Sequence, residues 1–123
     1  MIQVERVDFV SVPTRDLEKA VKFYGGTLGL ERDRRVPARF AEFETSNVTL
    51  SLWQPEEQGV PFQPSTSGIA LRVPDVALAR ERLEAAGVEF VGETVDTGVC
   101  HMGFFKDPDG NVLILHRRYA PHE

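Results

Sequence analysis

The stretch "FVSVPTRDLEKA", residues 9–20, aligns without a gap on "GIALRVPDVALA", residues 68–79. In each copy an alternating strand leads to an aspartate, Asp16 or Asp75, that can cap the helix after it. A capping carboxylate accepts hydrogen bonds from amide groups of the first helical turn. The repeat indicates that the chain contains two copies of one supersecondary unit.

The segments around the repeat complete each unit. Apolar stripes predict the two helices, the first ending at Gly25-Gly26 and the second at Gly87. Their members are Leu17, Ala20, Val21, Tyr24 and Leu28 in the first helix, and Val76, Ala79, Leu83 and Ala86 in the second. Strands are then predicted near 30–36, 39–45 and 47–53, and again near 88–95, 99–106 and 111–118. The chain is therefore expected to be one domain with a β-α-β-β-β module at about 5–53, a linker at about 54–67 and a second module at about 68–118.

Strand alternation divides each predicted sheet into two faces. The residues expected to face the helices are Val10, Val12, Leu50, Leu52, Ile69, Leu71, Leu113 and Leu115. The opposite face is expected to carry Phe9, Ser11, Ser51, Trp53, Gly68, Ala70, Ile114 and His116. Two curved sheets of this kind would enclose a cleft lined by the second set.

Composition excludes several classes of protein. The net charge is −5 and the basic pairs Arg34-Arg35 and Arg117-Arg118 are isolated, which argues against nucleic-acid binding. The single cysteine, Cys100, rules out an intrachain disulfide and is expected to be a small buried residue. No signal peptide or membrane-spanning run is present, so the cytoplasm is the expected location.

Two segments, "DLEKAVKFYGGTLGLE" (16–31) and "FFKDPDGNVLILH" (104–116), resemble motifs of the vicinal oxygen chelate superfamily. This superfamily holds glyoxalase I, extradiol dioxygenases, fosfomycin-resistance proteins and bleomycin-binding proteins. The resemblance implies an α+β fold in which two β-α-β-β-β modules form a curved mixed sheet around a cleft. It also implies a homodimer, but it does not choose an activity, because one fold serves many sites.

In metal-using members of the superfamily, a divalent ion is held by His, Glu or Gln on the first and last strand of each half. The resemblance places these four positions at Phe9, Ser51, Gly68 and Ile114. Three of them have no side-chain lone pair, and the hydroxyl of Ser51 is a poor ligand on its own. A one-residue slip of the last strands would substitute Leu52 and Leu115, which are no better. The sequence therefore predicts no metal at the usual positions, and no cofactor.

Other residues are candidates for a ligand site. His116 lies two residues beyond Ile114, on the same predicted face, where it can contact a ligand or act as a general base. His101 would neighbour His116 if their strands pair, and with Glu42 or Glu44 the two could form a displaced metal site. The full set of predicted ligand-binding residues is Phe9, Ser11, Ser51, Trp53, Phe62, Arg72, His101, Ile114 and His116.

Three functions fit this set. The first is a binder of a small, planar or hydrophobic molecule, similar to the bleomycin-resistance type, with Trp53, Phe9 and Phe62 as stacking walls. The second is a glyoxalase- or dioxygenase-like metalloenzyme using His101 and His116. The third is a metal-free enzyme with His116 as acid or base. Whether the two modules pair within one chain or between chains is left open by the sequence.

Overall fold

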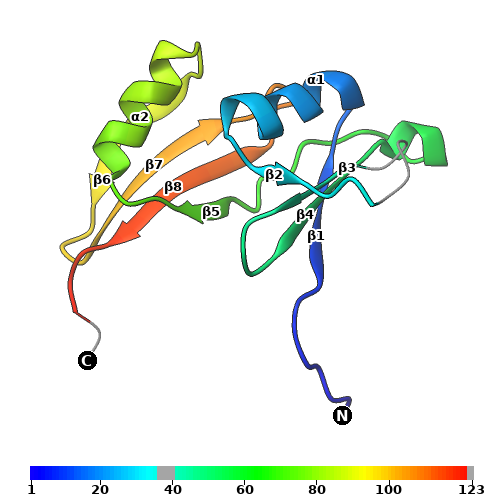
Figure 1. The fold of residues 1–123 in the computed structure, drawn as a ribbon, viewed down its shortest axis with the longest axis horizontal. Coiled ribbons are helices and arrows are strands. Elements are labelled where there is room, and N and C mark those ends of the chain that lie inside the picture. Colours follow the sequence, from blue (N-terminus) through cyan, green and yellow to red (C-terminus); the bar gives the residue numbers. More distant parts are fainter. Residues whose placement is uncertain (36–40, 122–123) are drawn as a thin grey trace. The chain divides into compact units, whose positions relative to one another are not determined.

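The computed structural model describes residues 1–35 and 41–121, and the chain divides into two compact units, Met1–Gln63 and Pro64–Glu123 (Figure 1). Each unit contains a four-stranded sheet. No helix in the described ranges is long and apolar enough to cross a membrane.

The first unit contains β1 (Phe9–Pro13), α1 (Leu17–Val21), η1 (Lys22–Thr27), β2 (Glu31–Arg32), β3 (Ala41–Glu44) and β4 (Thr49–Trp53). Its strands lie in the order β1-β4-β3-β2, with β1 parallel to β4 and the other pairs antiparallel. A short 3-10 helix, η2 (Pro55–Gln58), follows β4 in the predicted linker.

The second unit contains β5 (Ile69–Arg72), α2 (Val76–Ala85), β6 (Phe90–Asp96), β7 (Cys100–Lys106) and β8 (Val112–Arg118). Its strand order is β5-β8-β7-β6, and β5 is parallel to β8. The topology is the same as in the first unit, so the predicted repeat and the α+β architecture are confirmed. The structure builds the fold as two four-stranded mixed sheets.

Both predicted helix caps form. The carboxylate of Asp16 accepts from the amide of Lys19 at 3.1 Å, and that of Asp75 accepts from the amide of Leu78 at 3.0 Å. The second helix also ends where predicted, because Gly87 has a φ of 91° just beyond its last turn.

The predicted end of the first helix at Gly25-Gly26 is wrong. The helix continues through both glycines as the π-helix η1, which ends at Thr27, and Gly29, with a φ of 74°, follows its C-cap Leu28. A Cβ on Gly25 would lie 3.2 Å from the ring carbon Cε1 of Phe43. Gly25 therefore permits a close approach between helix and strand.

The strand predicted near 30–36 is shorter than expected. Only Glu31 and Arg32 are in β2, and the chain then turns at residues 34–35. The carboxylate of Asp33 accepts from the backbone amide and the guanidinium of Arg35, each at 3.0 Å, which favours a turn over an extended strand. Residue 36 and the first two residues of the strand predicted at 39–45 lie outside the described residues.

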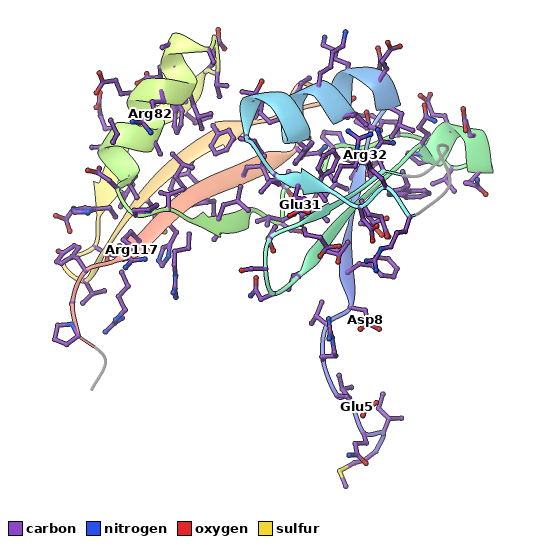
Figure 2. All side chains as sticks on the ribbon, in the orientation of Figure 1. Glu5, Asp8, Glu31, Arg32, Arg82 and Arg117 are labelled. Atoms are coloured by element: carbon purple, nitrogen blue, oxygen red, sulfur yellow. The ribbon has the colours of Figure 1, made fainter. Side chains whose placement is uncertain are left out.

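The predicted division into two faces is confirmed. Val12, Leu50 and Leu52 are 1% exposed, and Leu113 is fully buried. The parallel registers pair Ser11 with Ser51 on the opposite, open face of the first sheet. Charged residues such as Glu31, Arg82 and Arg117 lie at the surface of their units (Figure 2).

Candidate functional site

The open face of the first sheet brings together the polar and aromatic residues that the sequence placed there. Ser51 in β4 lies between Ser11 in β1 and Glu42 in β3, and Trp53 pairs with Pro13. Side chains of directly paired residues lie on the same face of a sheet. The face therefore combines an indole ring with two hydroxyls and one carboxylate.

Part of this face is hollowed into a groove of about 470 Å³, which we call the sheet-face groove. The residues that line it are Ser11, Pro13, Trp53, Pro55, Val60, Pro61 and Gln63. The linker therefore supplies one wall and the sheet supplies the other. Rigid proline rings and an indole favour an apolar or planar ligand, and the hydroxyl of Ser11 and the amide of Gln63 can orient it.

Two predicted aromatic residues lie away from this groove. Phe9, at the start of β1, is 56% exposed and pairs with Thr49. Phe62 packs under the guanidinium of Arg15, whose Cζ is 4.5 Å from the ring centroid. It is not among the described residues that line the groove. Trp53 is therefore the aromatic wall of the groove, and the predicted three-ring wall is not formed in the first unit.

The open face of the second sheet carries His116, Ile114 and Arg72. Arg72 in β5 pairs directly with His116, and Ile114 pairs with Ala70. On the other side of β8, Met102 pairs with His116 and Phe104 pairs with Ile114. All but Arg72 and Ala70 are half-buried.

Met102 and Phe104 were not predicted as site residues, although they extend the apolar surface of this face. The signal was present in the sequence. The turn at 107–111 sets Lys106 opposite Val112, and counting outward from that pair puts Phe104 beside Ile114.

His101 does not neighbour His116, contrary to the prediction. The antiparallel register pairs His101 with Arg117, one residue beyond His116, so the two histidines point to opposite faces of the sheet. Among the described residues, no group of three or more His, Cys, Asp or Glu is placed to hold a metal ion. His101 and His116 therefore do not form the two-histidine part of the predicted displaced metal site.

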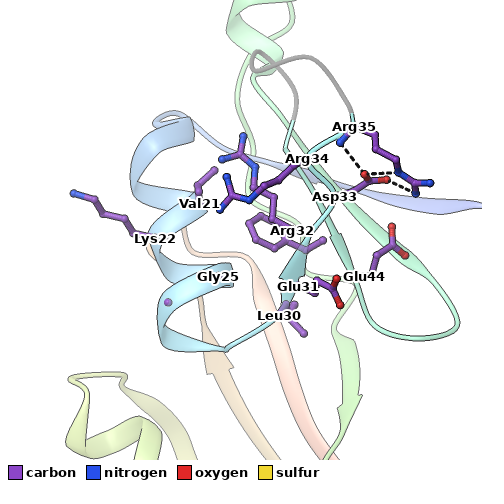
Figure 3. Close-up of a pocket in the computed structure, with 12 residues that line it drawn as sticks. Val21, Lys22, Gly25, Leu30, Glu31, Arg32, Asp33, Arg34, Arg35 and Glu44 are labelled. Carbon is purple, nitrogen blue, oxygen red and sulfur yellow. Dashed lines mark hydrogen bonds and ion pairs between the residues drawn. The ribbon is translucent and has the colours of Figure 1, made fainter.

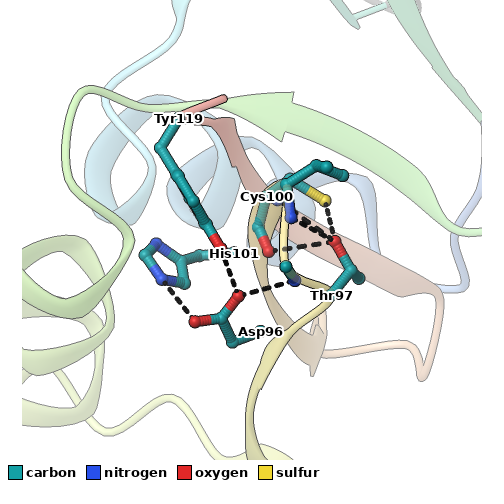
Figure 4. Close-up of polar contacts among 7 residues, drawn as sticks. Asp96, Thr97, Cys100, His101 and Tyr119 are labelled. Carbon is teal, nitrogen blue, oxygen red and sulfur yellow. Dashed lines mark hydrogen bonds and ion pairs between the residues drawn. The ribbon is translucent and has the colours of Figure 1, made fainter. Parts of the chain in front are cut away.

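His101 instead belongs to a polar cluster at the end of the β6–β7 hairpin (Figure 4). Its Nε2 atom lies 3.4 Å from Oδ2 of Asp96, and its ring stacks on that of Tyr119 with centroids 4.7 Å apart. The Tyr119 hydroxyl donates to Oδ1 of Asp96 at 2.7 Å. Cys100 is buried, and its Sγ lies 3.2 Å from the hydroxyl of Thr97. The cluster ties the segment after β8 to the hairpin.

The cluster predicts how stability depends on pH. Hydrogen bonds from the Gly98 amide and the Tyr119 hydroxyl lower the pKa of Asp96 below its ordinary 3.8, and the same carboxylate raises the pKa of Tyr119 above 10.0. Because the pKa of Asp96 is lower in the folded protein than in the unfolded chain, its carboxylate stabilises the fold at pH values above the unfolded pKa. This stabilisation is lost as the pH falls through the folded pKa. Because the pKa of Tyr119 is higher in the folded protein than in the unfolded chain, its hydroxyl stabilises the fold at pH values below the unfolded pKa. This stabilisation is lost as the pH rises through the folded pKa. Tyr119→Phe should therefore lower the melting temperature most between about pH 5 and pH 9, with the difference narrowing at both extremes. Thermal unfolding of both proteins across this pH range checks the prediction. A melting-temperature difference that stays constant with pH would contradict a stabilising hydrogen bond between the Tyr119 hydroxyl and the Asp96 carboxylate.

A known protein family matches most of the chain. Residues 6–115 match the model of the Glyoxalase/Bleomycin resistance protein/Dioxygenase superfamily. The chain belongs to this superfamily. No protein of curated function matches it.

Solved structures of the superfamily resemble the whole chain. The antibiotic-binding protein TnmS3 from Streptomyces sp. CB03234 is 28% identical, with a TM-score of 0.78, covering 96% of this chain and 99% of its own. A superfamily member from Sphaerobacter thermophilus is 27% identical, with a TM-score of 0.77 over 92% of this chain and 97% of its own. A glyoxalase family protein from Bacillus anthracis, at 21% identity and a TM-score of 0.79 over 96% of this chain and 98% of its own, shows the fold alone.

The four superfamily metal positions do not fit a divalent ion in this chain. Phe9 and Ser51 are offset by two residues across β1 and β4, and Gly68 and Ile114 have the matching offset in the second unit. Only Ser51 offers an oxygen, whereas a divalent ion is held by several carboxylate or imidazole ligands. A side chain at position 68 would also require Ile114 to move, because a Cβ there would lie 3.1 Å from its Cδ1 atom.

Gly68→Ala is expected to lower the free energy of unfolding by about 1–2 kcal/mol. Gly68 has a φ of 73°, which an L side chain rarely adopts, and the added methyl group would press on Ile114. Urea unfolding of this variant should be compared with Gly92→Ala, where φ is also positive, at 71°, and nothing lies within 4 Å of the added carbon. Equal stabilities of the two variants would contradict the close contact at position 68.

Proposed function

We propose that this chain binds a small, largely apolar organic molecule on its open sheet faces and does so without the divalent ion used by superfamily enzymes. The sheet-face groove carries the proposal. It combines the Trp53 ring, three prolines and Val60 with only two polar side chains, Ser11 and Gln63. Such a surface binds by burial and stacking more than by directed hydrogen bonds.

The second open face supports the same function. Ile114, Met102 and Phe104 form an apolar surface next to Arg72 and His116. The two cationic or titratable groups can contact a carboxylate or phenolate on the ligand. His116 is proposed here as a ligand contact, since no nucleophile or second base faces it in the registers of β5, β7 and β8.

The comparison with TnmS3 also favours a binding protein. That protein is an antibiotic-binding protein, and its sequence is 28% identical over nearly the full length of both chains. An antibiotic-sized organic compound is therefore the first class of ligand to test. We also propose a homodimer without a bound cofactor.

The ligand is identified by a thermal-shift screen of aromatic and polycyclic compounds, antibiotics included, and of divalent metal salts. A compound at about 100 times its dissociation constant adds roughly 2.7 kcal/mol of stability, which corresponds to a rise in melting temperature of about 10 °C for a chain of this size. Trp53 is the only tryptophan of the sequence, so its fluorescence should change on titration with the same compound.

The metal salts are the control for the alternative function. A melting-temperature rise with an organic compound and none with Zn²⁺, Mn²⁺ or Ni²⁺ supports the proposal. A stoichiometric metal that stays bound through purification without a histidine tag, and whose removal abolishes binding of the compound, would overturn it.

A further inference from the structure

A second groove, distinct from the sheet-face groove, lies on the helix side of the first unit. It has a volume of about 1000 Å³ and runs between η1 and β2 (Figure 3). Its apolar lining includes Val21, Leu30 and Phe43. We call it the helix-side groove, because Phe43 belongs to the buried face that the helix covers.

Two arginines face this groove from the strand side. Arg32 and Arg34 extend from β2 and the turn after it toward α1 and η1 (Figure 3). Arg32 pairs with Phe43 across β2 and β3, so its half-buried side chain lies on the helix-covered face. A cation in that position is costly unless an anion or water compensates its charge.

Neither arginine has an ion-pair partner among the described residues. Three carboxylates also line the groove: Asp33 pairs with Arg35 at 3.0 Å, Glu44 accepts from the hydroxyl of Thr49 at 2.9 Å, and the side chain of Glu31 is exposed. Glu31 pairs with Glu44 across β2 and β3 and therefore lies on the opposite face from Arg32. Among the described residues, the groove thus has two guanidinium groups without an ion-pair partner above an apolar floor, and it also carries the carboxylates of Glu31 and Glu44 on the face away from Arg32.

The glycines of η1 keep this floor open. A Cβ on Gly26 would meet nothing within 4 Å, so its absence leaves free space and an accessible backbone. Gly25 is held against the Phe43 ring, which forms the base of the groove. A ligand with a flat or branched apolar body would fit between helix and strand and present its charge to the arginines.

We propose that the helix-side groove is a binding site for a small organic anion, whose carboxylate or phosphate is held by Arg32 and Arg34 and whose apolar body packs on Val21, Leu30 and Phe43. Guanidinium groups bind carboxylates and phosphates through paired hydrogen bonds, and partial burial strengthens them. The site is independent of the proposed function, which uses the opposite face of the sheet.

The test uses 2-naphthoate and its uncharged analogue 2-naphthamide as probes, with amide chemical shifts of the ¹⁵N-labelled full chain as the measurement. 2-Naphthoate should shift the amides of Gly25, Gly26 and Leu30 and bind at least about tenfold more tightly than 2-naphthamide. 2-Naphthyl phosphate should shift the same amides, and its affinity relative to 2-naphthoate distinguishes phosphate from carboxylate ligands.

Variants separate the site from general attraction of anions. Arg32→Gln with Arg34→Gln should reduce the affinity for 2-naphthoate by about tenfold or more, whereas Arg82→Gln with Arg117→Gln in the second unit should leave it unchanged. Arg34→Gln alone, at an exposed position, should reduce affinity severalfold even if the double variant does not fold.

Three results would overturn the proposal. They are equal affinity of the acid and the amide, shifts confined to the open faces of β1 and β4, and no shift up to about 1 mM probe. A compound that binds the sheet-face groove should not displace 2-naphthoate. Each of the two proposed sites can therefore be refuted without affecting the other.

Discussion

Asn111→Ala is expected to lower the free energy of unfolding by about 3 kcal/mol. The Asn111 side chain is 2% exposed, and its Nδ2 donates to Oδ2 of Asp107 at 2.7 Å while its Oδ1 accepts from the Ser65 amide at 2.8 Å. Alanine removes both bonds and withdraws a partner from a carboxylate that is 5% exposed. Because buried polar groups that lose partners cost more than the bonds themselves, the effect exceeds that of an ordinary hydrogen bond.

Urea unfolding followed by circular dichroism measures this loss. Asn47→Ala is the matched control, since Asn47 lies in an exposed turn where its Oδ1 accepts from the Thr45 hydroxyl at 3.3 Å. The control should change stability by less than about 0.5 kcal/mol. If the two variants lose the same free energy of unfolding, the hydrogen bonds to Asp107 and Ser65 do not contribute the expected stability.

Features with a local physical cause were predictable from the sequence. The capping aspartates, the glycine that ends α2 and the alternation of the strands each depend on a few neighbouring residues. The leucines predicted to face the helices from β4 and β8 are indeed buried, with exposed fractions of 0–3%. The repeat made these predictions stronger, because each module supplied an independent reading of the same pattern.

Features that depend on distant partners were not predictable in the same way. The two glycines of η1 indicate a helix end by local propensity, but the helix continues through both, and Gly25 packs against Phe43, which is distant in the sequence. The side of His101 depends on the register between β7 and β8, and a shift of one residue reverses it. For the candidate site, sequence placed Trp53 and Ser11 on the correct face, but the wall made by Val60 and Gln63 comes from the fold of the linker.

Trp53→Ala is expected to weaken binding of the compound found in the thermal-shift screen by about 10- to 100-fold. The indole is the aromatic wall of the sheet-face groove, and alanine removes both its stacking surface and the apolar area that a ligand can bury against it. Trp53→Phe keeps a ring at the same position and should lose less than about tenfold. Because both variants remove the fluorescent reporter, affinity is measured by isothermal titration calorimetry, with Val91→Ala, an exposed change in the second unit, as the control. Unchanged affinity in Trp53→Ala, with the melting temperature of the unliganded variant maintained, would place the ligand elsewhere and remove the argument that this groove is the binding site.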